Sequence, residues 1–230
     1  MTSLLAMMLL VQADSAEETF KKIGEAILQA KSVRVEFQWE GAARANAGGK
    51  VEASGTVLLK ERNRASLTGL ITEKGQPSEL RIVSDGTTVK TRLGARRMLE
   101  CPTPRNMESG LKMAIHRLGA MQAVLIAHKV CMLEVSDQEE ALDMGKKPRL
   151  SDFKNGADDG EFRTMTYKIS PDGPDTVAEI KIWYSPETHL LEKRTITLKQ
   201  PSESIFTESY KGWTLDGSLE NEEFTLPSVK

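Results

Sequence analysis

The chain has 230 residues, of which 39% are hydrophobic, and its 31 basic and 33 acidic side chains almost cancel. A chain of this length can bury a core of its own, and its charged residues, 28% of the total, are typical of a solvated globular surface. Because no long basic run accompanies this charge balance, we expect no nucleic-acid partner.

The N-terminal segment has the order of parts that is typical of an export signal. A continuous apolar run occupies residues 4–11, and small and polar residues follow it as far as Ala16. We therefore predict that residues 1–16 are a signal peptide, cleaved after Ala13 or, as the second choice, after Ala16. The alternative is a buried N-terminal helix in a cytoplasmic protein, because residues 1–3 carry no Lys or Arg. The run is too short to span a bilayer, so we expect a periplasmic or secreted protein.

The first half of the chain predicts one helix followed by a meander of strands. Residues 17–31 carry apolar side chains at helical spacing, which predicts an amphipathic helix of about four turns. The period then changes to two, and each of the segments that follow has one apolar face. Asp85 and Gly86 form a two-residue hairpin signal between the last two segments. The five predicted strands cover residues 33–39, 50–61, 65–71, 79–84 and 87–93.

The second half predicts another helix and another set of strands. Residues 107–125 have one apolar stripe, which predicts a single helix of about 20 residues, and residues 136–160 form a polar connection rich in Gly and Asp. Four further strands are predicted at residues 161–169, 176–184, 190–199 and 204–213. Because the connections are too short for parallel crossovers, we predict an α+β fold with a curved antiparallel sheet, covered by the N-terminal helix and the central helix.

The chain has two cysteines, Cys101 and Cys131, and they bracket the predicted central helix. In an oxidising compartment they can close a loop of about 30 residues, which would stabilise the fold by about 3 to 4 kcal/mol. Two free, buried thiols are an equally open alternative, because the geometry cannot be derived from sequence. The pair is therefore a candidate disulfide.

No motif for catalysis, a metal or a cofactor stands out in the sequence. It has no HExxH metal site, no GxSxG nucleophile elbow, no P-loop and no GxGxxG after a predicted strand. His116 and His128 lie twelve residues apart on the predicted helix, about 120° from each other, so they cannot share a metal ion from one face. We expect His116 to be a solvated or capping residue. The sequence predicts no enzyme, no metal site and no cofactor.

The best candidates for a binding site are apolar residues that alternate along the first three predicted strands, with small residues among them. If the curved sheet encloses space that the helices only partly fill, these side chains line an apolar cavity. If they pack on one another, they form an ordinary core, and composition alone favours the core. The candidate cavity residues are Phe37, Trp39, Val57, Leu59, Leu67 and Ile71.

Four segments carry a family resemblance through their order and spacing. They are the opening helix 17–31 that runs into residues 33–37, the hairpin at 84–88, the late strand and turn at 180–191, and the ending at 222–227. With these segments the chain resembles the periplasmic outer-membrane lipoprotein carrier family (LolA-like, with the lipoprotein localisation factor fold). The resemblance implies a single domain over residues 17–230, built as an unclosed (half) β-barrel of about 9 to 11 strands with a helical lid. It also implies an apolar cavity that takes up acyl chains without catalysis.

Two functions from different classes stay open. The first is a soluble periplasmic carrier in outer-membrane biogenesis, a monomer that binds lipid or lipoprotein acyl chains and does not span the membrane. The second is a non-enzymatic periplasmic interaction or sensor module, with the same fold and a filled core, whose partners would be envelope proteins. An aromatic content of only 5% supports the second function. We favour the carrier, because the resemblance covers nearly the whole chain after the predicted signal peptide.

Overall fold

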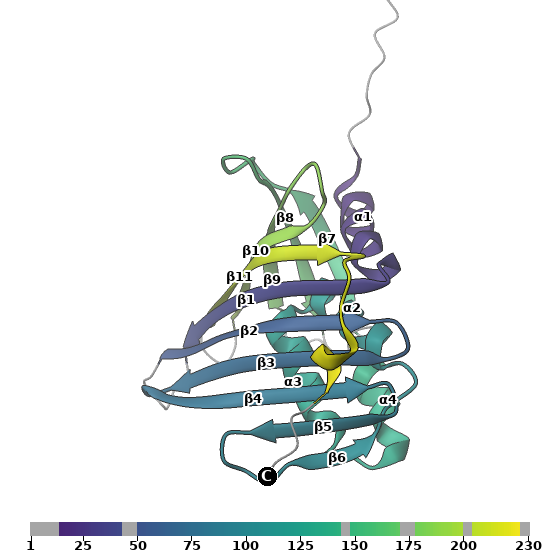
Figure 1. The fold of residues 1–230 in the computed structure, drawn as a ribbon. Helices are drawn as coiled ribbons and strands as arrows, with labels where there is room; N and C mark the ends of the chain where they lie inside the picture. The colour runs from purple at the N-terminus through teal and green to yellow at the C-terminus, as the bar shows by residue number, and fades with distance from the viewer. Residues whose placement is uncertain (1–13, 43–49, 144–147, 171–177, 200–203, 226–230) are drawn as a thin grey trace, which may run out of the picture.

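The structure is a computed structural model that describes residues 14–42, 50–143, 148–170, 178–199 and 204–225. The described residues form one antiparallel sheet of eleven strands, four α-helices and a short 3-10 helix (Figure 1). The first six strands are β1 (Ser32–Ala42), β2 (Lys50–Lys60), β3 (Arg64–Glu73), β4 (Gln76–Asp85), β5 (Thr88–Leu93) and β6 (Leu99–Pro102). The other five are β7 (Arg149–Asn155), β8 (Arg163–Ser170), β9 (Ala178–Tyr184), β10 (Leu191–Leu198) and β11 (Ser204–Leu215). The helices are α1 (Ala16–Gln29), α2 (Met107–Arg117), α3 (Ala120–Val130), α4 (Val135–Asp143) and the 3-10 helix η1 (Asn221–Phe224).

The sheet is open. Its strand order is β6-β5-β4-β3-β2-β1-β11-β10-β9-β8-β7, so the first and last strands of the chain, β1 and β11, pair in the middle. The two edge strands, β6 and β7, do not pair with each other. The predicted fold class, an α+β protein with an unclosed antiparallel sheet of about 9 to 11 strands, is confirmed.

Helix α1 begins at a capping box. The Ser15 hydroxyl accepts a hydrogen bond from the Glu18 amide, and the Glu18 carboxylate accepts one from the Ser15 amide. The buried side of the helix carries Phe20, Ile23 and Ile27, whose spacing predicted it. The N-terminal helix is therefore confirmed. Of the predicted signal peptide, residues 1–16, only residues 14–16 lie in the described part of the chain, so the signal peptide stays a prediction.

The single central helix predicted over residues 107–125 is wrong. Two helices, α2 and α3, meet at Gly119, whose φ of +114° favours glycine. A Cβ at this position would also collide with the Glu208 carboxylate. Both helices bury an apolar face, so the apolar spacing continues across the break and does not reveal it.

The polar connection predicted over residues 136–160 contains a helix and a strand. Helix α4 buries only Gln138 and Leu142, too few residues for a recognisable apolar stripe. Strand β7 pairs with β8, but its register shifts around Asp152, which has a φ of +56°. The shift interrupts the period of two that identifies a strand in a sequence. Strand β6, which the sequence also did not predict, is only four residues long.

The helices and the C-terminal segment lie on opposite faces of the sheet. Helices α2, α3 and α4 lie behind strands β2 to β6 in Figure 1, and α1 lies beside β7. The main core fills the space between these helices and the inner face of the sheet. On the outer face, η1 lies over β3 and β4, and Leu58, Leu219 and Phe224 form a second, small core.

Two links hold the helical layer to the β6 edge of the sheet. Cys101 on β6 and Cys131 after α3 form a disulfide in the structure, with their Cα atoms 5.3 Å apart. Close by, Oγ1 of Thr91 on β5 and Nδ1 of His128 on α3 share a hydrogen bond of 2.7 Å. The C-terminal end of α3 is therefore fixed to the two strands at this edge.

Candidate functional site

The six predicted cavity residues share the inner face of the sheet, as their alternation predicts. Val57 lies opposite Leu67, and Ala53 lies between Trp39 and Ile71 on neighbouring strands. Trp39 and Ile71 are half-buried against the main core, and the other four are buried within it. The buried four are Phe37, Val57, Leu59 and Leu67. The structure packs these side chains into the core, and their role in binding a ligand stays a prediction.

A glycine on this face makes room for a ring. Gly55 on β2 lies between Phe37 on β1 and Gly69 on β3. A Cβ on Gly55 would lie 3.0 Å from Cε1 of Phe37 and would collide with the carbonyl oxygen of Thr68. The Phe37 ring packs against Gly55, so this glycine serves the packing of the core.

A pocket of about 540 Å³ lies between α1, α2 and β7. Apart from the buried Phe20, its apolar side chains are half-buried, so they face both the protein and the pocket. Ligand pockets typically have volumes of roughly 300 to 1,000 Å³, with mainly apolar walls and a few polar groups. The apolar lining consists of Phe20, Leu28, Met113, Pro148, Leu150 and Phe153. We refer to this site as the α1–α2–β7 pocket.

Aromatic rings pack at one side of this pocket. The Phe20 ring lies 5.2 Å from the Phe153 ring and 4.8 Å from the Tyr167 ring, measured between centroids. The Tyr167 hydroxyl donates a hydrogen bond of 3.1 Å to the carbonyl oxygen of Arg117 at the end of α2. The cluster joins α1, α2, β7 and β8, and it forms a fixed wall on one side of the pocket.

His116 is a buried member of the pocket lining, and the expectation that it is solvated or a capping residue is wrong. Its side chain is only 5% exposed, and its ring lies 4.2 Å from the Phe20 ring between centroids. A Cβ on Gly24 would lie 2.6 Å from Nε2, so the glycine in α1 makes room for the imidazole. The other nitrogen, Nδ1, is buried and has no hydrogen-bond partner among the described residues.

The His116 ring is held in its neutral form. Burial is the main cause, and the positive charges of Arg194 and Arg117 add to it, so that the pKa of His116 falls from 6.5 to about 3. A neutral imidazole carries a proton on one nitrogen and a lone pair on the other. His116 can therefore donate or accept a hydrogen bond inside an otherwise apolar wall.

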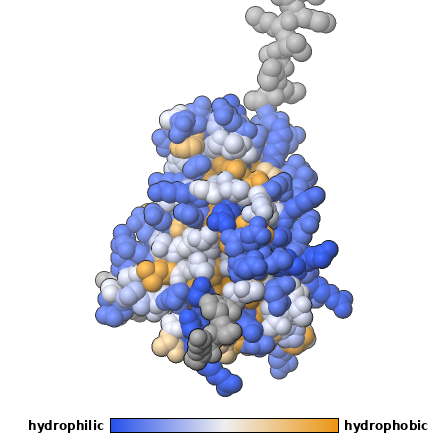
Figure 2. All heavy atoms as spheres, viewed as in Figure 1, coloured by the Kyte–Doolittle hydropathy of each residue, from blue (hydrophilic) through white to orange (hydrophobic). Residues whose placement is uncertain are grey.

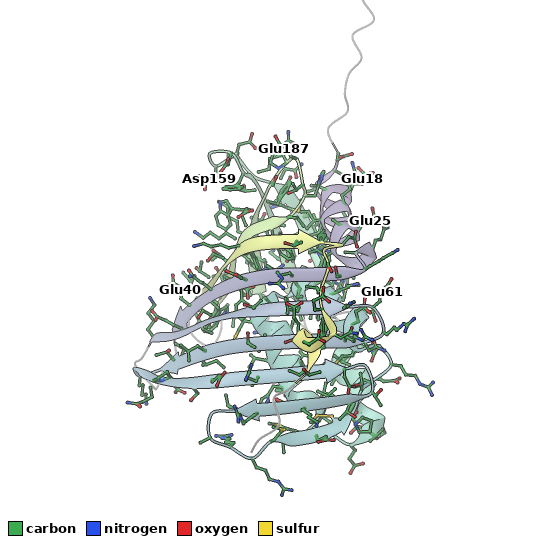
Figure 3. All side chains as sticks on the ribbon, in the orientation of Figure 1. Glu18, Glu25, Glu40, Glu61, Asp159 and Glu187 are labelled. Atoms are coloured by element: carbon green, nitrogen blue, oxygen red, sulfur yellow. A yellow bond between two sulfur atoms is a disulfide. The ribbon has the colours of Figure 1, made fainter. Side chains whose placement is uncertain are left out.

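The rim of the pocket carries charges of both signs. Glu17 and Lys21 form an ion pair of 2.9 Å along α1, and Glu25 is exposed on the same helix (Figure 3). Arg117 donates a hydrogen bond of 3.3 Å to the carbonyl oxygen of Pro148, and Arg149 is exposed at the start of β7. A ligand that enters this pocket would pass charged side chains before it reaches the apolar walls.

Behind the pocket, two opposite charges are buried where the helices meet the sheet. Arg194 on β10 and Glu208 on β11 are cross-strand partners, and both are at least 98% buried. Arg194 donates to the carbonyl oxygens of Ile115 and His116, at 3.2 and 2.5 Å, at the C-terminal end of α2. A guanidinium at this end of a helix is favoured by the helix dipole.

Glu208 binds the other helix of this corner, α3. It accepts hydrogen bonds from the amides of Ala120 and Met121, at 3.1 and 2.7 Å, at the N-terminal end of α3, and from the Tyr210 hydroxyl. Burial raises the pKa of Glu208, while Arg194 and these hydrogen bonds oppose the shift. The Arg194–Glu208 pair therefore docks the corner between α2 and α3 onto the sheet.

A second pocket of similar volume lies over β1, β2, β3 and β11 and includes Trp39. Most of its walls are polar or charged side chains, among them Gln38, Glu52 and Thr207. Figure 2 shows that the face of the sheet turned towards the viewer is largely hydrophilic, with small hydrophobic areas. The α1–α2–β7 pocket is the better site for an apolar ligand.

In the part of the chain that the structure describes, no group of three or more His, Cys, Asp or Glu side chains is placed to hold a metal ion. Among the same residues, no helix is both long enough and apolar enough to cross a membrane.

Neither the pocket nor the Arg194–Glu208 pair was predicted from the sequence. The pocket depends on β7, whose irregular register removed the alternation of a strand. The charge pair did leave a signal, because Glu208 alternates with Phe206 and Tyr210 on one face of the predicted strand. Burying a charged residue without a partner costs free energy, so a charged residue within an apolar face indicates a specific contact.

Comparison with known proteins gives only distant structural similarity. No protein-family model matches the chain. No curated protein matches it either. Similar solved structures include a LolA superfamily protein from Nitrosomonas europaea, with 10% identity and a TM-score of 0.36, covering 93% of this chain and 99% of that one.

Two other similar structures are LprF from Mycobacterium bovis and a putative outer membrane lipoprotein-sorting protein domain from Vibrio parahaemolyticus. LprF has 13% identity and a TM-score of 0.40, covering 86% of this chain and 92% of its own. The Vibrio domain has 11% identity and a TM-score of 0.36, covering 91% and 97%. With TM-scores below 0.5, these similarities carry no argument about the ligand or activity of this chain.

Proposed function

We propose that this chain is a non-catalytic periplasmic carrier that takes a long aliphatic chain, such as a lipid or lipoprotein acyl group, into the α1–α2–β7 pocket. The observation that carries the proposal is a pocket of about 540 Å³ whose walls are half-buried apolar side chains. Covering such side chains with an aliphatic ligand stabilises the complex by roughly 25 cal/mol per Å² of apolar surface removed from water.

The pocket suits an aliphatic chain better than the inner face of the sheet does. On the inner face, Val57, Leu59 and Leu67 are fully buried under the helices, so a ligand there must first displace packed side chains. Around the pocket, Leu28, Met113 and Leu150 already face an open volume. The binding site that we propose is therefore not the one that the sequence predicted.

Native mass spectrometry of protein purified from its own envelope tests the proposal. We expect a co-purified species with the mass of a lipid or acylated peptide. In the Leu150→Trp variant the larger side chain should fill the pocket and remove this species. The matched control is Ile205→Trp, which places the same side chain at an exposed position on β11. Parent protein without any bound lipid, and without uptake of added acyl-chain probe, would contradict the carrier function.

The filled inner core favours a second candidate function. Four of the six predicted cavity residues are packed within the core, as a non-enzymatic interaction or sensor module of this fold requires. Such a module would bind envelope proteins and would leave the α1–α2–β7 pocket empty. The same mass spectrum separates the two functions, because only the carrier retains lipid.

We further propose that the mature domain begins at Asp14, after removal of residues 1–13. Cleavage there keeps Ser15, which caps α1, and Asp14, which pairs with Lys22. Cleavage after Ala16 would remove both residues and cost about 1 kcal/mol through loss of the cap. The intact mass of exported protein distinguishes the two cleavage sites, and a retained Met1 would contradict export.

A further inference from the structure

Of the five large apolar side chains that are exposed among the described residues, three lie within four consecutive positions. Met132, Leu133 and Val135 occupy the turn from α3 into α4 and are 53%, 38% and 65% exposed. The other two, Leu70 and Ile205, lie singly on β3 and β11. Single exposed apolar side chains are normal on a protein surface, whereas contiguous ones mark a contact with another molecule. We call Met132, Leu133 and Val135 the α3–α4 patch.

The α3–α4 patch is held in place by the protein itself. Cys131, the residue before the patch, is bonded to Cys101 on β6, so the turn is fixed to the edge of the sheet (Figure 1). The buried Gln138 side chain donates a hydrogen bond of 3.4 Å to the carbonyl oxygen of Leu133. The apolar side chains are therefore presented to solvent in a defined conformation, which lowers the entropic cost of binding a partner.

Carboxylates without a cationic partner accompany the patch. Glu134 lies within it, Asp137 and Glu139 follow on α4, and all three are exposed. None of the three forms an ion pair within the described part of the chain. Lys129, at the end of α3, is the one basic residue in the stretch 129–143. The patch therefore combines apolar side chains with an excess of negative charge.

We propose that the α3–α4 patch is the docking surface for a second protein, which contacts it with apolar side chains flanked by Lys or Arg. The partner's apolar side chains would cover the patch, and its basic side chains would pair with Glu134 and Asp137. Complementary charges of this kind speed association and select the partner. An anionic lipid surface fits less well, because it would repel the same carboxylates. The inference is independent of the α1–α2–β7 pocket, whose lining shares no residue with the patch.

Site-specific photocrosslinking in cells of the protein's own organism tests the inference. A photoreactive benzoylphenylalanine takes the place of Leu133 in the full chain, and the matched control carries it in place of Ile205, which is singly exposed on β11. We expect one discrete protein adduct from position 133 and none from position 205. Mass spectrometry of the digested adduct should place the crosslink on a partner peptide that has Lys or Arg next to apolar residues.

Charge reversal separates a specific contact from a non-specific one. Glu134→Lys together with Asp137→Lys should lower the yield of the adduct about tenfold, because like charges then face each other in the complex. The matched control is Glu161→Lys together with Glu187→Lys, which should leave the yield unchanged. Both control residues are exposed, and Glu187 lies at the opposite end of the molecule from α4 (Figures 1 and 3).

Thermal unfolding of each variant checks that it is folded. If the charge-reversed variant unfolds, Glu134→Gln together with Asp137→Asn repeats the test, because it removes the negative charges without adding positive ones. Equal adduct yields from positions 133 and 205, or a yield that survives the loss of both charges, would overturn the inference. It would also be overturned by an adduct with lipid or with a second copy of the chain, and by the absence of any adduct from position 133.

Discussion

Two regions of this protein are lined by apolar side chains, yet only one of them keeps space for a ligand. Under α2 and α3, the side chains of β1 to β3 pack into a core, and the Phe37 ring packs against Gly55. Between α1, α2 and β7, half-buried side chains surround about 540 Å³. The two regions differ in the elements that meet there. Regularly paired strands pack against α2 and α3 in the first region, whereas α1 and the C-terminal half of α2 meet the irregular edge strand β7 in the second.

This comparison shows why apolar alternation is a poor guide to a cavity. A regular alternation gives a smooth apolar face, and two helices can cover such a face completely. The register shift around Asp152 breaks the regularity of β7, so α1 cannot cover it in the same way. The open volume therefore lies where the sequence pattern is weakest.

The largest expected effect concerns the charge pair that docks the α2–α3 corner between the two regions. Glu208→Met removes one buried charge and leaves Arg194 without compensation, which should lower the free energy of unfolding by about 3 to 5 kcal/mol. Adding Arg194→Met should cost less than the sum of the two single changes, because it removes the uncompensated charge. Urea unfolding measures all three variants. A loss below about 1 kcal/mol in the single variant would contradict the docking role.

The second-largest effect concerns the disulfide, which anchors the helices over the packed core and lies away from the pocket. Its removal should affect the core but not the pocket. Replacing Cys101 and Cys131 together by Ser should lower the free energy of unfolding by about 3 to 4 kcal/mol in the loop-entropy model. The acyl-chain affinity of the folded protein should not change. Thiol labelling of the unreduced, denatured parent gives the control, and two reactive thiols there would show that the bond is absent.

A pair of Trp substitutions compares the two regions directly. Leu67→Trp adds volume to the packed core and should lower the free energy of unfolding by about 1 to 3 kcal/mol through overpacking. Leu150→Trp extends into the pocket, so the free energy of unfolding should stay within about 0.5 kcal/mol while the acyl-chain probe no longer binds. Thermal unfolding and probe titration measure both quantities. Equal destabilisation by the two changes would show that the pocket is as tightly filled as the core.

The last effect is a pH dependence that arises from the pocket wall, and it is the smallest near neutral pH. The pKa of His116 is about 3 in the folded protein and 6.5 in the reference state, so below pH 6.5 the unfolded chain binds a proton that the folded chain does not. Stability should fall as the pH drops from about 6.5 towards 3, by at most about 1.4 kcal/mol per pH unit. The comparison of parent with His116→Phe isolates this contribution. Identical pH profiles of unfolding would contradict a buried, neutral His116.

The sequence predicts the regular parts of the fold well. Alternation locates β1 to β5, and the hairpin signal at Asp85 and Gly86 correctly joins β4 and β5. The break at Gly119 escaped prediction because its cause is tertiary: the corner is held by Arg194 and Glu208, which are far from it in sequence. A local pattern cannot show such a contact.

The sequence predicts less of the candidate site. Phe20 belongs to the predicted stripe of α1 and does line the pocket, whereas Ile23 and Ile27 of the same stripe lie in the core. Leu150 and Phe153 lie in a segment that resembles a polar loop, because the positive φ of Asp152 disrupts the strand pattern. The sequence predicts a solvated or capping His116, because its burial depends on Gly24, a glycine whose role becomes visible only when α1 and α2 are packed together.

Photocrosslinking with an aliphatic carboxylic acid that carries a diazirine in its chain, followed by mass spectrometry of the digested protein, tests the binding site most directly. If the aliphatic chain occupies the α1–α2–β7 pocket, the label should appear on peptides that contain Leu28, Met113 or Leu150, and Leu150→Trp should abolish it. Label on peptides of β1 to β3 around Phe37 and Leu67 would contradict the pocket as the binding site and would show that the core opens to take the ligand.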